Sequence, residues 1–522
     1  MSMGANRPQW VTHQLNLRKW MDGWVDDMIM NHGTMPWRHG HDEGIFTRTL
    51  PAFYMLSGYA PALEFSQKLC TEFIDSPLTE ACDCFLTKED MVPFKDRKLV
   101  SKWHGYQEEW SCLCHGPENF SWFLAHLAHI SKDPKYIAAL EDYAEHLGNW
   151  SPEVPDWYNW EEHRFVSCHL GTKVVRAHAP YDYDSDTHIR AMTVAMNAYS
   201  LTGNQRYLDL VVNWMEKWAD LIMKAGPEGF RVKVYPVPDE QVEGLYGEFG
   251  SLHTTTVEYQ LGHMMLDIVR AGASRAFLEP VKKMIALGID RHDWAMGQLI
   301  AKYRMVSGDT QFDQTVLDYA ETAMSRDAEI PGFIVTINPP SDSVYEGNDF
   351  ITVGKDSAVT KDERSVSWLA CAYQISGDER YINSSMYIAW MRFWAGWYLW
   401  DGRQFGCRGS WTGRNGFAMH NVIPALLMGA TGGFGMVEGE APWFEVTYRG
   451  SNGEDGLPEG VATLFNPAAK TIAFANTTTQ PQTVRYANTS RTLSPLTKPV
   501  TGDDWSEIDI PADGLMVVPI PS

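Results

Sequence analysis

The chain has no long hydrophobic run, and this absence limits the kind of protein it can be. No stretch of about eighteen or more consecutive apolar residues occurs in its 522 residues, so the sequence predicts no membrane-spanning helix. The first ten residues, MSMGANRPQW, lack a basic patch followed by an apolar core, which a secretory signal needs. We therefore expect a cytoplasmic protein on the chain as given, or a periplasmic or secreted one if a signal was removed.

Positive charge and paired cysteines are also scarce. The net charge of −23 argues against nucleic-acid binding, which needs a basic surface, although a local cluster of Arg and His can still bind an anionic substrate. The eight cysteines form no disulfide framework. The C-x-C pairs Cys82/Cys84 and Cys112/Cys114 have no zinc-finger partners, so we expect buried thiols.

Apolar and aromatic residues are plentiful. The chain is 44% hydrophobic and 21% charged, as expected for a globular protein with a large core. Aromatic residues make up 12% of the chain and include 21 Trp. Most of them must be core, but Trp and Tyr also stack on the apolar faces of sugar rings. The composition therefore raises the prospect of a carbohydrate ligand.

A short pattern recurs along the chain: an apolar helix, a turn with Gly or Asp, an aromatic residue and a second helix. Examples are AHISKDPKYIAAL, AYSLTGNQRYLDL and YQISGDERYINSS. Glycine suits the left-handed residue that ends a helix, and Asp or Asn caps the next one. The turn positions are Gly58, Asp133, Gly203, Gly272, Gly308, Gly377 and Gly432.

These repeats predict stacked helical hairpins over residues 15–435. The helix before each turn is apolar on most sides, which favours an inner position, and the helix after it is more amphipathic. The long, irregular connections 148–185 and 225–250 favour a closed toroid over a solenoid with regular repeats. Residues after 436 form short β-branched and aromatic runs, which predict strands.

The expected fold is therefore mainly α. It is an (α/α)6 or (α/α)7 toroid, or barrel, of helical hairpins followed by a small antiparallel β-domain. Residues 1–436 are the predicted catalytic toroid, and residues 437–522 are the predicted β-sandwich-like domain.

Polar residues precede the turns by 13–19 positions, which at about 1.5 Å per residue is roughly 20–28 Å of helix. They therefore lie at the N-termini of the inner helices, which meet at one mouth of a toroid. Helix capping alone accounts for residues such as Asp186 and Ser251, but it explains the recurrent His less well. The polar residues in these positions are His41, Asp42, His115, His188, His253, His292, Asp293, Asp362, Arg364, Arg414 and Asn415.

Four long polar and aromatic loops are expected at the same mouth: YQEEWSCLCHGPEN, HAPYDYDSDTHIR, EGLYGEFGSLHTTTVEY and CRGSWTGRNGFAMHN. Loops at one end of a rigid scaffold commonly carry a binding site. Donors and positive helix ends suit a polyhydroxylated, acidic ligand. The substrate-binding residues expected here are His41, Asp42, Glu118, Asp184, Asp186, Glu248, Tyr259, His292, Asp293, Trp411, Asn415 and His420.

With this architecture, and with the local segment GEFGSLHTTTVEY, the chain resembles the (α/α)-toroid enzymes of carbohydrate metabolism. These include polysaccharide lyases of the chondroitin AC, alginate and heparinase types, and toroid glycosidases acting on uronosyl sugars. The resemblance covers nearly the whole chain. It implies a site built from His253, from Tyr259 or Tyr246, from Asn119 or Asn415, and from Arg414.

A lyase removes the C5 proton of a uronate and expels the sugar linked at O4. Donors such as His115, Asn119 and Arg414 can neutralise the uronate carboxylate, while His253, His188 or Tyr246 transfers the proton. We therefore expect β-elimination of a glycan that contains uronic acid. The predicted catalytic residues are His115, Asn119, His188, Tyr246, His253 and Arg414.

A glycoside hydrolase is the main alternative, because the same loops are rich in carboxylates that could act in pairs. Its candidates are Glu118, Asp184, Asp186, Glu243, Glu248 and Asp293. A sugar epimerase, with His188 paired with His253 or His420, ranks third, and a non-catalytic glycan-binding protein ranks fourth.

The expected partner is an acidic oligo- or polysaccharide, with no nucleic acid and no membrane, and a homodimer stays open. No cofactor is expected. No spacing such as H-E-x-x-H indicates a metal, although His and Asp at the mouth leave a divalent metal ion open.

Overall fold

A computed structural model gives the fold. The structure describes residues 3, 6–31, 49–80, 99–107, 124–167, 170–173, 175–178, 182, 184, 188–224, 255–291, 294–328, 335–336, 352–353, 364–398, 422–433, 443–489 and 504–520. This part of the chain is mainly helical with a small antiparallel β region, as the sequence predicts. Its helices include none that is long and apolar enough to cross a membrane.

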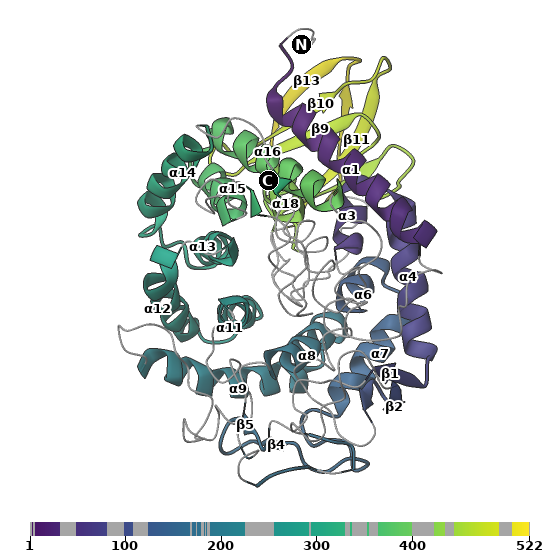
Figure 1. Ribbon diagram of the computed structural model, residues 1–522, viewed down its shortest axis with the longest axis vertical. Helices are drawn as coiled ribbons and strands as arrows, with labels where there is room; N and C mark the ends of the chain where they lie inside the picture. Colours follow the sequence, from purple (N-terminus) through teal and green to yellow (C-terminus); the bar gives the residue numbers. More distant parts are fainter. Residues whose placement is uncertain are drawn as a thin grey trace.

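The helices lie in two rows around a common centre (Figure 1). The inner row consists of α3 (Leu50–Ser57), α6 (Ala125–Ser131), α8 (Ile189–Thr202), α11 (Thr255–Arg270), α13 (Trp294–Ser307), α15 (Arg364–Ser376) and α18 (Ile423–Ala430). Each inner helix contacts the next one along the chain, and α18 contacts α3. The outer row consists of α1 (Gln9–Asn31), α4 (Ala60–Asp75), α7 (Pro134–Glu145), α9 (Gln205–Lys224), α12 (Leu278–Gly288), α14 (Asp313–Ala328) and α16 (Glu379–Tyr398).

The tight turns lie where the repeat predicts them. The six predicted turn glycines all have positive φ, from 68° at Gly432 to 103° at Gly272. At the seventh turn Lys132 takes the left-handed conformation instead, and Asp133 caps α7 by accepting from the amide of Lys135 at 2.9 Å. We call the end of the hairpins that carries these turns the turn end, and the opposite end, where the inner helices begin, the head end.

The predicted difference between inner and outer helices is clear in the pair α8 and α9. Every residue of α8 from Ile189 to Ser200 is buried. In α9 the buried residues recur every three or four positions, for example Tyr207, Leu210, Val211 and Trp214, so α9 presents one face to the core. The buried thiols Cys70 and Cys371 confirm the expectation for the two cysteines that the structure describes.

The β region after α18 has two antiparallel three-stranded sheets. One has the order β13 (Gly514–Pro519), β10 (Thr471–Asn476), β9 (Val461–Asn466), and the other β12 (Ser506–Ile510), β11 (Gln482–Asn488), β8 (Val446–Gly450). The ring of Phe474 in the first sheet lies 6.0 Å from Tyr448 and 5.1 Å from Tyr486 in the second. The inner faces of the two sheets therefore share one aromatic core.

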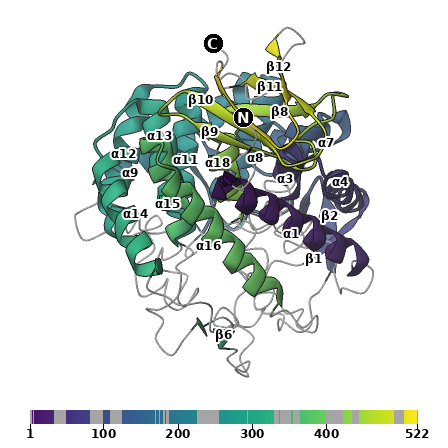
Figure 2. The same cartoon turned by 90° about the horizontal axis from the view of Figure 1, so that it is seen from above.

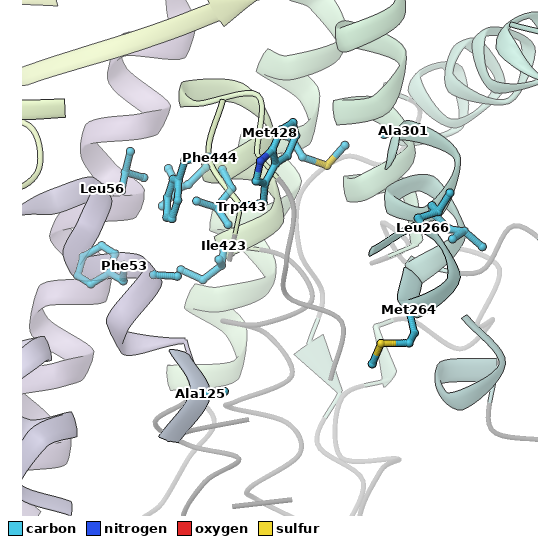
Figure 3. Close-up of a cluster of buried hydrophobic side chains, with 14 of the residues drawn as sticks. Phe53, Leu56, Ala125, Met264, Leu266, Ala301, Ile423, Met428, Trp443 and Phe444 are labelled. Carbon is cyan, nitrogen blue, oxygen red and sulfur yellow. The ribbon is translucent and has the colours of Figure 1, made fainter. Parts of the chain in front are cut away.

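The β region packs on the turn end over three of the hairpins. Gly58, Gly377 and Gly432 approach it so closely that a Cβ atom at each would lie within 2.6–2.8 Å of Asp455, Asn466 or Phe465. Figure 2 shows the strands lying over α1, α3 and α18, and the same elements are in contact. Buried side chains of α3 and α18 pack there with Trp443 and Phe444 (Figure 3).

Two side chains of α1 bind the backbone of the β region. Gln14 both donates to and accepts from the backbone of Thr463, at 2.9 and 2.8 Å. Arg18 is buried and donates to the carbonyls of Val461, Leu457 and Ser57. Burial lowers the pKa of Arg18 to about 10. These bonds fix α1 to β9 and to the turn that follows α3.

The connections between hairpins contain short strands, whereas the sequence predicted only irregular connections between the helices of residues 15–435. The strands are β1 (Leu78–Glu80), β2 (Leu99–Trp103), β3 (Tyr106–Gln107), β4 (Tyr158–Asn159), β5 (Arg164–Phe165), β6 (Val335–Thr336) and β7 (Thr352–Val353). Their pairings are all antiparallel. The short 3-10 helices η6 (Arg275–Phe277) and η7 (Ile289–Arg291) flank α12.

Candidate functional site

Most of the predicted site residues lie outside the described residues. These are His41, Asp42, His115, Glu118, Asn119, Asp186, Glu243, Tyr246, Glu248, His253, His292, Asp293, Asp362, Trp411, Arg414, Asn415 and His420. Tyr259 and Arg364 are described only by their backbone positions, in α11 and at the start of α15. Asp184 and His188 are fully described, and they lie together at the head end of α8.

Asp184 and His188 form a buried carboxylate–imidazole pair. The Nδ1 atom of His188 lies 2.5 Å from Oδ1 of Asp184. His188 is 0% exposed and Asp184 is 4% exposed. His188 occupies the N-cap position of α8, yet its side chain makes no capping hydrogen bond. Ordinary helix capping therefore does not account for this histidine.

Two further donors hold the carboxylate of Asp184 in place. Its Oδ2 atom accepts from the indole Nε1 of Trp214 at 2.7 Å and from the backbone amide of Phe165 at 3.0 Å. Together with His188, these donors engage both oxygens of the carboxylate. The ring of Phe165 also meets the imidazole edge to face at 4.8 Å. The carboxyl group of Asp184 is thus fixed in position.

The pair and the residues that hold it come from three separate parts of the chain. Phe165 ends the β4–β5 hairpin, which is held on α9 by a 2.7 Å hydrogen bond from the Tyr158 hydroxyl to Asn213. Trp214 is the next residue of α9. The outer helix and the hairpin therefore position Asp184, and Asp184 positions His188 on the inner helix.

The pair suits proton transfer by the imidazole. A carboxylate at Nδ1 selects the tautomer that carries its proton there, so the lone pair is on Nε2. The same carboxylate stabilises the imidazolium that forms when Nε2 accepts a proton. Asp184 is less suited to the role of a hydrolase acid or nucleophile, because both of its oxygens already accept hydrogen bonds inside the protein.

A second buried polar cluster joins α11 and α13 near the turn end. Asp267 accepts from Arg270 at 2.8 Å and pairs with Lys302 at 2.9 Å. Burial lowers the pKa of Lys302 to about 8. The guanidinium of Arg270 lies over the ring of Trp443, at 4.8 Å. The cluster thus connects α11 to the segment that leads into the β region, which is a structural role.

Only one group of three side chains in the described part of the chain could hold a metal ion. It comprises His104, His146 and Glu153, next to the C-terminal end of α7. Sequence reasoning missed these residues, as it missed Trp214. The dipeptide His104–Gly105 between two aromatic residues is a turn signal that could have marked the first of them.

Comparison of the chain with protein-family models, with curated proteins and with solved structures finds no match.

Proposed function

We propose that this protein is a carbohydrate-active enzyme, a polysaccharide lyase that cleaves a uronic-acid-containing glycan by β-elimination. The observation that carries the proposal is the Asp184–His188 pair, a buried imidazole oriented by a fixed carboxylate at the head end of α8. Lyase chemistry needs one oriented base, whereas glycoside hydrolysis needs two carboxyl groups free to act on the bond.

In this mechanism His188 takes the C5 proton at Nε2. The electrons of the C5–H bond form a C4–C5 double bond, the C4–O4 bond breaks, and the leaving oxygen takes the proton from the His188 imidazolium, which returns the ring to its neutral form. Asp184 does not itself accept a proton, because it acts by holding the tautomer and by stabilising the positive imidazolium. Trp214 and the Phe165 amide in turn keep the carboxylate in place.

The proposal includes an (α/α) toroid as the scaffold, with residues 1–436 as the catalytic domain and 437–522 as the β-domain. The two rows of helices and the succession of contacts along the inner row support it. Seven inner helices in the described residues favour seven hairpins over six, with α1 completing the outer row between α16 and α4. The β region covers part of the turn end, which leaves the head end for the substrate.

The test is incubation with uronate-rich polysaccharides while the ultraviolet absorbance of a conjugated 4,5-unsaturated product is followed. We expect this absorbance to rise with time. His188→Gln should lower kcat by about 10²–10⁴-fold, the usual contribution of a general base, and Asp184→Asn should lower it by about 10-fold or more.

His163→Gln is the matched control, because His163 also pairs with a carboxylate, Glu216, at 3.0 Å, but on the surface of α9. It should keep full activity. New reducing ends without the absorbance would contradict the lyase and favour the hydrolase. Full lyase activity in His188→Gln would instead exclude the Asp184–His188 pair as the base.

A further inference from the structure

His104, His146 and Glu153 converge from three segments of the chain at the outer side of the head end. His104 is in the turn between β2 and β3, His146 directly follows α7, and Glu153 lies in the segment after it. One ligand atom from each lies within 4.8 Å of the other two. Two imidazoles and a carboxylate are a ligand set that zinc and its neighbours in the first transition row prefer.

A single residue, Asp142, orients both imidazoles. The Nδ1 atom of His104 lies 2.7 Å from the Asp142 carboxylate, and the Nδ1 atom of His146 lies 2.6 Å from the Asp142 carbonyl oxygen. Both oxygens are acceptors, so each ring carries its proton on Nδ1 and its lone pair on Nε2. Metal-binding histidines are commonly held in this way by an oxygen acceptor at the other nitrogen.

The backbone at His104 is an independent sign of a constrained position. His104 and Gly105 have φ of 46° and 89°, and Trp103 pairs with Tyr106 across them. Two positive φ values in a two-residue loop define a tight hairpin turn in which Asn or Gly is the usual first residue. A histidine there carries a conformational cost. The turn points its ring at α7, where it meets His146 with ring centroids 5.0 Å apart.

The surroundings hold the buried histidine in place. The ring of His146 packs edge to face on Trp103 at 4.8 Å and on Tyr106 at 5.9 Å. Glu153 and Asp142 bring two carboxylates to the site, and a divalent cation would balance their charge. The chain as a whole carries −23, so its overall field also attracts cations.

We propose that His104, His146 and Glu153 bind one divalent transition-metal ion of the zinc class, which ties the β2–β3 turn to the end of α7 and to the segment after it. Bonds of about 2.0–2.1 Å in tetrahedral geometry place ligand atoms about 3.3 Å apart. The exposed side chains of His104 and Glu153 therefore move toward the buried His146 by up to about 1.5 Å. Asp142 is a positioning residue, and a water molecule completes the coordination.

The test uses the full chain, freed of metal with a chelator and titrated with Zn²⁺ against a chromophoric competitor. We expect one ion per chain with a dissociation constant in the micromolar range or below. Co²⁺ should bind to the same site and give the visible absorption bands of a Co²⁺ ion with a low coordination number. Both readouts are independent of any enzymatic activity and of the lyase proposal.

His104→Ala is the main variant, because His104 is exposed and its loss should leave the fold intact. It should weaken Zn²⁺ binding by about 100-fold and abolish the Co²⁺ bands, while the metal-free protein keeps its circular dichroism and its Tm. Asp142→Ala keeps all three ligands and should weaken binding by about 10–100-fold, as the loss of an orienting acceptor does.

His163→Ala is the matched control. His163 also has positive φ, at 57°, and pairs with a carboxylate, but it lies outside the group. It should bind Zn²⁺ like the parent protein. Zn²⁺ binding that is absent at millimolar concentration in the parent chain, or unchanged in His104→Ala and Glu153→Gln, would overturn the proposal.

Discussion

The turn glycines offer a direct measure of how tightly the β region packs on the hairpins. Gly58 and Gly203 both end an inner helix with nearly the same conformation, at φ 69° and 72°. Alanine in this region costs roughly 1–2 kcal/mol, because its Cβ crowds the backbone. This part of the cost is common to both positions.

The two glycines differ in their surroundings. A Cβ at Gly203 would meet nothing within 4 Å, whereas one at Gly58 would lie 2.7 Å from the carbonyl oxygen of Asp455. Neither atom can move without a shift of the backbone, because the Cβ is attached to the main chain and its neighbour is a carbonyl oxygen. Overpacking of this kind costs about 1–3 kcal/mol. We therefore expect Gly203→Ala to lower the free energy of unfolding by about 1–2 kcal/mol and Gly58→Ala to lower it by about 2–5 kcal/mol.

Urea-induced unfolding followed by Trp fluorescence measures both values. Limited proteolysis adds a local readout, since Gly58→Ala alone should speed cleavage within the β region. Equal losses of stability in the two variants would refute the reasoning, because they would mean that the β region does not press on this turn.

Three other changes test separate features. Arg18→Met leaves three carbonyl groups, two of them buried, without their donor and should cost about 3–5 kcal/mol of unfolding free energy in urea titrations. Burial raises the pKa of Glu445 from 4.5 to about 7. The contribution of Glu445 to the free energy of unfolding is therefore full below about pH 4.5 and is lost as the pH rises through 7, a total decrease of about 3 kcal/mol. Glu445→Gln should remove this loss between pH 5 and pH 8, whereas the same change at the exposed Glu507 should not. Trp214→Phe removes one donor to Asp184 and so loosens the carboxylate that orients His188, which should lower the rate of product formation by less than Asp184→Asn does.

The turns were predictable because their signals are local. A glycine after an apolar run, or an Asp before Pro134, encodes the end of one helix and the cap of the next within a few residues. The repeat of that signal predicted the hairpins. The short β-branched and aromatic runs after residue 436 predicted the β region. The antiparallel β1–β3 sheet lacks such a clear alternation and was missed.

The site was predictable only in part. Asp184 and His188 are four residues apart and were both named as candidates, but the partners that fix their roles, Trp214 and Phe165, come from a helix and a hairpin that only the folded chain brings together. The group of His104, His146 and Glu153 was missed for the same reason. These three residues lie in separate segments, so their distances along the chain follow no regular metal-binding motif.

The hydrogen bonds between α1 and the β region join segments that are synthesised far apart in time. Gln14 and its partner Thr463 are 449 positions apart. At about 5–20 residues per second, a ribosome needs roughly 20–90 s to deliver the partner after α1 has been made. Through most of that interval α16 and β9, which α1 contacts in the final fold, have not been made, so apolar residues of α1 such as Trp10, Leu17 and Trp24, all buried in the final fold, lack these packing partners. The nascent N-terminal segment is therefore where a holding chaperone would act.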